Sequence, residues 1–171
     1  MTLGTQLFVT RNGPPRRGEY PSSRVDNKPF RALWTSTFLP DGPFASAWIE
    51  MTGLPYASPV GNVPAPAYLL RPSKRAAVRE IGSAGDWSAL LERYSVERGG
   101  LLAAIDWERV SDDYDAVHMK GAGVRATHTL KEDSSNGWDV ESTAWFRWAF
   151  SGVESYDGPL VRTDQAAPRR E

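Results

Sequence analysis

The stretch WDVESTAWFRW, residues 138–148, follows an Asn-Gly turn signal and decides how the rest of the chain is interpreted. If it is a strand, the two-residue period puts on one face Trp138, Val140, Ser142, Ala144, Phe146 and Trp148. The other face then carries Asp139, Glu141, Thr143, Trp145 and Arg147. Only the first set has the composition of a core face, and acidic residues are poor strand formers. The second face therefore indicates either a solvated outer surface or an acidic catalytic pair held on a rigid strand.

Composition sets the class of protein. The 171 residues suffice for one domain with a proper core and are too few for two ordinary ones. We therefore expect a single domain over residues 1–152, followed by a polar and frayed tail over residues 153–171. A hydrophobic content of 40% and a net charge of -1 indicate a soluble globular protein with no bias toward nucleic acid or anionic membranes.

The chain offers little for metals, disulfides or membranes. It has no cysteine and 2 histidines, so neither a disulfide framework nor a zinc centre is expected. Its longest apolar runs are far shorter than the ~20 residues of a membrane span. The first residues also lack the pattern of a secretory signal. These features favour an intracellular location without a metal cofactor.

Strands and helices alternate irregularly along the chain. Strands are expected at residues 6–10, 31–38, 67–71, 77–81, 116–119, 124–130 and 138–148. Helices are expected after Asp41, after Asp86 and after Asp106, because each is followed by apolar residues at helical spacing. Residues 120–123 would be the turn of a hairpin. This order predicts an α+β fold with a mixed, largely antiparallel sheet and a few short helices.

Three consecutive hydroxyl residues follow Trp34 on the expected strand 31–38. Alternation puts Ser36 on the face of Trp34, and Thr35 and Thr37 on the other. WTST could simply be a good strand sequence. It gains meaning beside Arg11, which ends the first strand, and beside the Asp139-Val140-Glu141 segment.

In this order the residues resemble the arginine, serine, glutamate pattern of ADP-ribosyltransferases of the bacterial-toxin class. The segments LWTSTF, IDWERVSDDYDAVHM and GWDVESTAWFRW are similar, as a series, to small proteins of actinobacteria and their phages. The resemblance covers about residues 7–148. It implies an ADP-ribosyltransferase-like fold, with NAD as the substrate to be cleaved and an acceptor that the sequence does not identify.

The resemblance implies catalytic roles for Glu141, Asp139 and Ser36. Glu141 would hydrogen-bond a ribose hydroxyl of NAD and stabilise the oxocarbenium-like charge as nicotinamide leaves. Asp139 would orient the acceptor, although the family usually has Glu or Gln there. Ser36 would fix the Glu141 carboxylate or the ribose.

The resemblance also implies cofactor-binding roles for Arg11, Trp34, Thr35 and Trp145. Arg11 would hold the diphosphate, because its guanidinium is planar and permanently charged. Trp34 or Trp145 would stack on the nicotinamide, and Thr35 would lie beside them. No metal is needed for this chemistry.

Two other classes of function stay open. His118 and His128 flank the expected turn and could form the acid and base of a metal-independent ribonuclease. The neutral net charge argues against a nucleic-acid partner. Alternatively, the chain is a non-enzymatic phage virion, assembly or binding protein, which uses aromatic residues and Arg147 at a protein interface. An enzyme predicts that Arg11, Ser36 and Glu141 converge in one pocket, whereas an assembly protein predicts that they diverge.

Overall fold

The computed structural model describes residues 3–10, 12–20, 25–26, 28–52, 66–96, 104–130, 135 and 137–162. Its strands are β1 (Gln6–Val9), β2 (Val25–Asp26), β3 (Leu33–Thr37), β4 (Ala67–Pro72), β5 (Val78–Ile81), β6 (Ser95–Val96), β7 (Ala104–Asp106), β8 (Ala116–Met119), β9 (Ser142–Trp145) and β10 (Phe150–Tyr156). Its helices are α1 (Ala47–Thr52), α2 (Ala84–Tyr94), α3 (Trp107–Asp113) and α4 (Gly121–Thr127). The predicted α+β class is confirmed.

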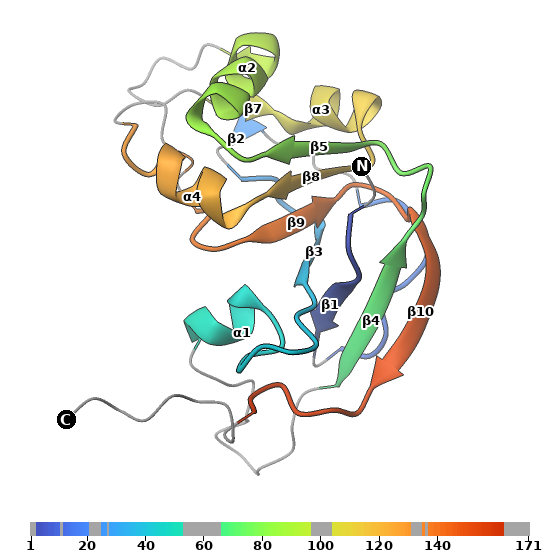
Figure 1. The fold of residues 1–171 in the computed structure, drawn as a ribbon. Helices are drawn as coiled ribbons and strands as arrows, with labels where there is room; N and C mark the ends of the chain where they lie inside the picture. The colour runs from blue at the N-terminus through green and yellow to red at the C-terminus, as the bar shows by residue number, and fades with distance from the viewer. Residues whose placement is uncertain are drawn as a thin grey trace, which may run out of the picture.

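A curved seven-stranded sheet organises the described residues. Its strand order is β10-β4-β1-β3-β9-β8-β5, and all neighbours except β5 and β8 run antiparallel. Strands β2, β7 and β6 form a second, small sheet. Figure 1 shows α2 and α3 beside the β5–β8 edge, and α1 beside β3. The largely antiparallel arrangement is therefore as predicted, with one parallel pair at the edge.

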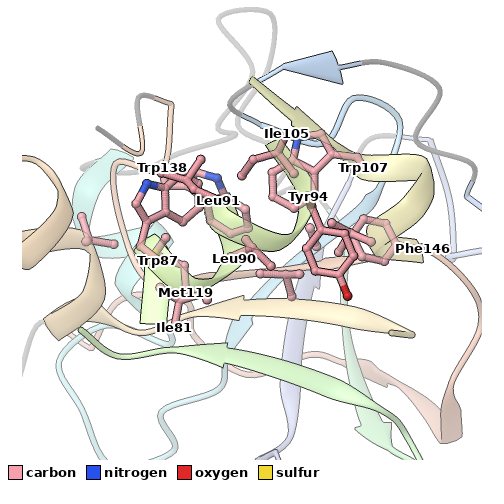
Figure 2. Close-up of a cluster of buried hydrophobic side chains, with 14 residues drawn as sticks. Ile81, Trp87, Leu90, Leu91, Tyr94, Ile105, Trp107, Met119, Trp138 and Phe146 are labelled. Carbon is pink, nitrogen blue, oxygen red and sulfur yellow. The ribbon is translucent and has the colours of Figure 1, made fainter. Parts of the chain in front are cut away.

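The main hydrophobic core lies between the helices α2 and α3 and the β5–β8–β9 end of the sheet. Figure 2 shows Trp87, Trp107 and Trp138 gathered there with Phe146, and the three indoles are fully buried. The Trp107 ring lies 6.3 Å from Trp138 and 6.2 Å from Phe146. Large aromatic side chains bury much apolar area, so this cluster is a major source of stability.

The helix starts follow from capping chemistry. Asp106 caps α3 by accepting from the Arg109 amide, as predicted. For α2 the predicted start at Asp86 is wrong. Ser83 is the N-cap, while the Asp86 carboxylate returns to the Gly82 amide and the Ser83 hydroxyl, in the manner of a capping box. The helix expected after Asp41 begins only at Ala47, and its Met51 is 45% exposed.

The predicted hairpin after β8 is wrong, because residues 121–127 form helix α4. Gly123 explains why this helix fits. A Cβ at Gly123 would lie 2.3 Å from the Ile81 carbonyl oxygen, so α4 approaches β5 backbone to backbone. Val124 and Thr127 are buried at helical spacing. The alternating pattern in residues 124–130 therefore did not reflect a strand.

The predicted frayed tail over residues 153–171 is also wrong for residues 153–162, which the structure describes. Strand β10 runs through residue 152 and pairs with β4 along its length. Beyond it, the Arg162 guanidinium donates to the Leu39 and Gly42 carbonyls. A domain boundary at residue 152 would cut a strand of the main sheet. Residues 53–65 and the final residues 163–171 lie outside the described residues.

Candidate functional site

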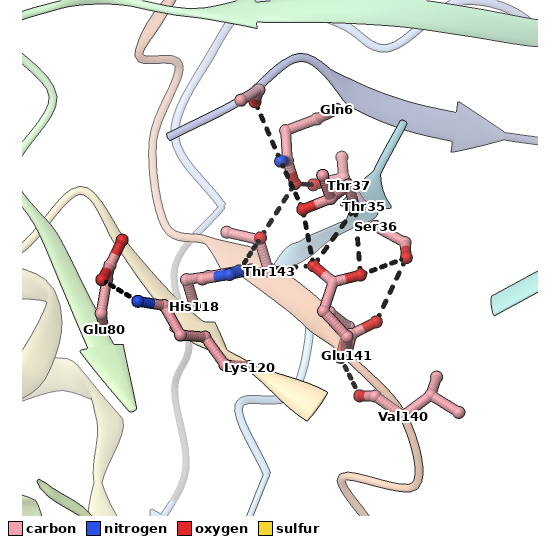
Figure 3. A network of polar contacts seen from close by, with 12 residues as sticks. Gln6, Thr35, Ser36, Thr37, Glu80, His118, Lys120, Val140, Glu141 and Thr143 are labelled. Atoms are coloured by element: carbon pink, nitrogen blue, oxygen red, sulfur yellow. Dashed lines mark hydrogen bonds and ion pairs between the residues drawn. The ribbon is translucent and has the colours of Figure 1, made fainter. Parts of the chain in front are cut away.

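The site is built where the pairing of β3 and β9 ends. Thr35 pairs with Thr143, so the same register places Thr37 opposite Glu141, which directly precedes β9. At this position the Thr37 amide bonds the side-chain carboxylate of Glu141 instead of a backbone carbonyl of the neighbouring strand. The carboxylate accepts from the Thr37 amide at 3.1 and 3.2 Å, from Thr37 Oγ1 at 2.8 Å and from Ser36 Oγ at 2.6 Å (Figure 3). Glu141 is thus held by three donors on one strand, with 15% of its side chain exposed.

A buried hydrogen-bond network lies behind this carboxylate, and its directions can be assigned. Gln6 Nε2 faces the Gly4 carbonyl at 3.1 Å, which fixes the orientation of the amide. Gln6 Oε1 then accepts from Thr35 Oγ1 at 2.8 Å and Thr143 Oγ1 at 2.9 Å. The Trp145 indole, which can only donate, donates to Thr35 Oγ1 at 2.9 Å. Every hydroxyl proton in this part of the network is therefore committed.

The network determines the tautomer of His118. Thr143 Oγ1 has given its proton to Gln6, so at 2.9 Å from His118 Nδ1 it must accept from that nitrogen. His118 Nδ1 also lies 3.5 Å from Glu141 Oε1. Burial lowers the pKa of the His118 imidazole, while the nearby Glu141 and Glu80 carboxylates oppose that shift. His118 is therefore neutral at pH 7, with its proton on Nδ1.

A cavity of about 170 Å³ opens beside Ser36, between β3, α1 and the segment before β9. It is lined by Leu7, Val9, Lys28, Trp34, Thr35, Ser36, Ser46, Trp48, Ile49, Gly137, Asp139, Val140 and Ser142. Two indoles and an apolar floor thus meet one ammonium, one carboxylate and several hydroxyls. A mostly apolar hollow with a few convergent polar groups is typical of a small-molecule site.

Lys28 and Asp139 supply the charges of this cavity. Lys28 Nζ lies over the Trp34 ring, 4.5 Å from its centroid, in a cation–π contact. Burial lowers the pKa of Lys28, and the Asp139 carboxylate opposes that shift. The Trp34 and Trp138 rings also form a T-shaped pair, with centroids 4.9 Å apart. The contact with the fully buried Trp138 helps to hold the Trp34 indole in place.

A second, more open hollow of about 300 Å³ lies on the other side of residues 139–141. It is lined by Ala47, Glu50, Met51, Gly121, Val124, Arg125, Asp139, Val140 and Glu141. Asp139 and Val140 therefore form a wall between the two hollows. Ser36 lines the first hollow and Glu141 the second, so the Ser36–Glu141 pair joins them.

The structure brings together most of the residues that the sequence singled out. Ser36 and Glu141 are hydrogen-bonded, and Trp34, Thr35 and Asp139 line the cavity next to them. Arg11 lies outside the described residues, so its place in the site stays a prediction.

The role expected for Trp145, a stacking contact with nicotinamide, does not fit the structure. Its side chain is fully buried, packs against Phe150 at 4.3 Å between centroids and donates to Thr35. Stacking on nicotinamide needs an accessible ring face, so the predicted cofactor contact of Trp145 is wrong. The solvated outer surface, one of the two alternatives for this face, does not hold at Thr143 and Trp145, which are fully buried, whereas Asp139 on the same face is exposed.

The two histidines were expected to meet across a hairpin, and the structure has a helix there instead. His118 lies on β8 and bonds Thr143, whereas His128 caps the end of α4, where its Nε2 lies 3.0 Å from the Trp138 carbonyl. No hairpin joins them. The ribonuclease alternative has no geometric support in the described residues.

Sequence reasoning did not assign a role to Gln6, Lys28, Thr37 or Trp48. A glutamine at the start of an otherwise apolar strand was a usable sequence signal. Such a residue is often buried, as Gln6 is, and a buried amide must be hydrogen-bonded. Lys28 gave none, since a lysine in a polar loop is normally solvated.

Comparisons with known proteins do not identify this chain. A scan against protein-family models matched no family, and searches of curated proteins and of solved structures found no significant match. Over the part of the chain that is described, no group of acidic and histidine side chains could hold a metal ion. No described helix has the length and apolarity to cross a membrane. Any function must therefore be argued from the geometry of the site.

Proposed function

We propose that this protein cleaves NAD at the bond between ribose and nicotinamide, and transfers ADP-ribose either to an acceptor or to water. The observation that carries the proposal is the Glu141 carboxylate, which lines the second hollow and is held by Thr37 and by Ser36, a residue that lines the adjoining indole-lined cavity. A carboxylate fixed by hydrogen bonds before substrate arrives is preorganised to stabilise positive charge, and such preorganised electrostatics supply much of the rate acceleration in many enzymes.

The reaction needs stabilisation of a cation rather than a strong base. The C1′–N bond breaks with its electron pair going to nicotinamide, which leaves neutral, and positive charge develops on the ribose. An acceptor oxygen or nitrogen, or water, then bonds C1′ and releases one proton to solvent. Glu141 would face the ribose from the second hollow, where that hollow adjoins the indole-lined cavity at Ser36, and stabilise that charge. Neutral His118 behind it adds no competing positive charge.

The other residues divide between binding and orientation. Trp34 would contact the nicotinamide in the cavity, which Thr35 also lines. Asp139 forms the wall between the two hollows, where it would meet the acceptor. Arg11 would hold the diphosphate, as the resemblance implies. An intracellular site of action, where NAD is abundant, goes with this proposal.

One observation favours a non-enzymatic alternative. The same three donors that preorganise Glu141 also complete the end of the β3–β9 ladder, so the carboxylate has a structural task in its own right. A chain that kept this ladder end for stability alone would be a binding or assembly protein, in a virion for example.

The test is NAD consumption by the purified protein and by Glu141→Gln. Glutamine can keep its oxygen toward Thr37 and turn its NH₂ toward Ser36 Oγ. The Ser36 hydroxyl can then donate to the backbone carbonyl of residue 141, which lies 3.2 Å from Ser36 Oγ in the wild-type structure. The variant should therefore fold but lose the charge. Losing a central electrostatic contact should lower the rate about a hundredfold or more.

Glu154→Gln is the matched control, since Glu154 on β10 makes an exposed ion pair with Arg71 on β4. Nicotinamide release by wild type and control but not by folded Glu141→Gln supports the enzyme. If wild type neither releases nicotinamide nor binds NAD in calorimetry, the enzymatic proposal fails and the binding or assembly role takes its place.

A further inference from the structure

Lys28 occupies the position that a cationic ligand would take in the indole-lined cavity. Its ammonium sits over the face of Trp34, 4.5 Å from the centroid, and near enough to Asp139 for that carboxylate to raise the pKa of Lys28 against the effect of burial. The face of an indole attracts cations, and a carboxylate nearby adds to that attraction. The protein's own lysine therefore already supplies the positive charge that Trp34 and Asp139 attract.

The backbone makes room for this lysine. Gly137 has φ +93, and a Cβ there would lie 3.3 Å from Lys28 Cδ and 3.6 Å from Lys28 Cβ. The stem of Lys28 thus passes closely over Gly137 on its way to Trp34. Lys28 is also exposed as a whole residue, so its ammonium can swing into water without unfolding anything.

The remaining walls favour a flat organic cation. Leu7, Val9 and Ile49 give an apolar floor, and Trp34 and Trp48 provide aromatic surface. An inorganic cation would gain little from that floor, and an anion would meet Asp139. A cationic aromatic ring could use the indole face, the carboxylate and the floor together.

We infer that Lys28 is an internal competitor, which holds the Trp34–Asp139 position in the free protein and is exchanged for the cationic ring of the ligand. The inference rests on the proposed function, where the ring is the N-alkylated pyridinium of NAD. The exchange keeps the charge of the cavity constant, because one cation replaces another beside Asp139. Neutral nicotinamide, the leaving group, cannot make this exchange, and returning Lys28 would help to expel it.

The experiment uses 1-methylnicotinamide as the cationic probe and nicotinamide as its neutral counterpart, each titrated into the full chain by calorimetry. Lys28→Gln keeps a polar side chain that is one atom shorter and removes the charge, and Lys28→Ala removes the charge and nearly the whole side chain. Removing the competitor should tighten binding of 1-methylnicotinamide about two- to thirtyfold, the range of a cation–π contact. Lys74→Gln, an exposed lysine in the turn between β4 and β5, should change nothing.

Tighter binding of the cation to both Lys28 variants, without a similar gain for nicotinamide, supports the inference. Unchanged or weaker binding, equal gains for both probes, or no binding of the cation to any variant overturns it. Circular dichroism of both variants shows whether folding is kept, and two different replacements guard against one of them failing. If wild type consumes NAD but the variants show no gain, the inference alone fails; if the variants gain but NAD is not consumed, the proposed function alone fails.

Discussion

The hydroxyl of Thr143 connects Gln6 to His118 in the buried hydrogen-bond network. The cost of removing this hydroxyl can be predicted from the bonds that are lost. Thr143→Val keeps the shape of the side chain and removes one donor and one acceptor at a fully buried position. Gln6 Oε1 would retain Thr35 as a donor. His118 Nδ1 would be left with the Glu141 oxygen at 3.5 Å, which is beyond a good hydrogen bond.

The expected cost follows from these losses. A neutral hydrogen bond contributes about 1 kcal/mol net, and a buried donor left unsatisfied costs about 1–3 kcal/mol. Two bonds are lost, while one of the two partners keeps an alternative. We therefore expect Thr143→Val to lower the free energy of unfolding by about 2–3 kcal/mol.

Urea unfolding followed by tryptophan fluorescence measures this, with the m-value showing whether the transition is otherwise unchanged. Thr129→Val is the control, since Thr129 makes an exposed bond to the Ala126 carbonyl and should cost within about 0.5 kcal/mol. The imidazole nitrogen shifts of His118 in NMR should show the Nδ1-protonated tautomer in wild type. A Thr143→Val cost no larger than that of the control, or a His118 protonated on Nε2, would refute the directions assigned to the network.

Two further predictions test the fold around the site. The lowered pKa of His118 means that the unfolded chain takes up a proton before the folded one does. The free energy of unfolding should fall as the pH drops below about 6.5, by at most about 1.4 kcal/mol per pH unit. The His118→Gln variant should lose this pH-dependent contribution. If the free energy of unfolding changes equally with pH in wild type and in the variant, the prediction is wrong. Gly123→Ala should cost more than about 3 kcal/mol, because its Cβ would meet the Ile81 carbonyl at 2.3 Å. Gly121→Ala in the same helix meets only the end of Arg125 at 3.5 Å and should stay within about 1 kcal/mol in thermal unfolding; similar costs for the two would show that α4 does not pack this closely.

The failures of sequence reasoning share a physical cause. Residues 124–130 alternate like a strand, but the helix is fixed by the close approach of Gly123 to β5, which no local pattern expresses. The C-terminal segment looked frayed because its residues are polar and interrupted by glycine. As an edge strand, β10 gains its stability from backbone pairing with β4, which does not depend on residue type in the same way.

The sequence by itself determined the α+β class and most strand positions, which follow from local periodicity and turn residues, properties of neighbours along the chain. The choice of Ser36, Trp34, Asp139 and Glu141 as site residues came from the resemblance of these segments to ADP-ribosyltransferases. The tertiary structure decided the rest. Only the adjacency of β3 and β9 in the sheet brings Glu141 to Ser36 and buries Trp145, and only the turn at Gly137 lets Lys28 reach Trp34. Contacts between residues far apart in sequence depend on strand order and register, which a single sequence does not specify.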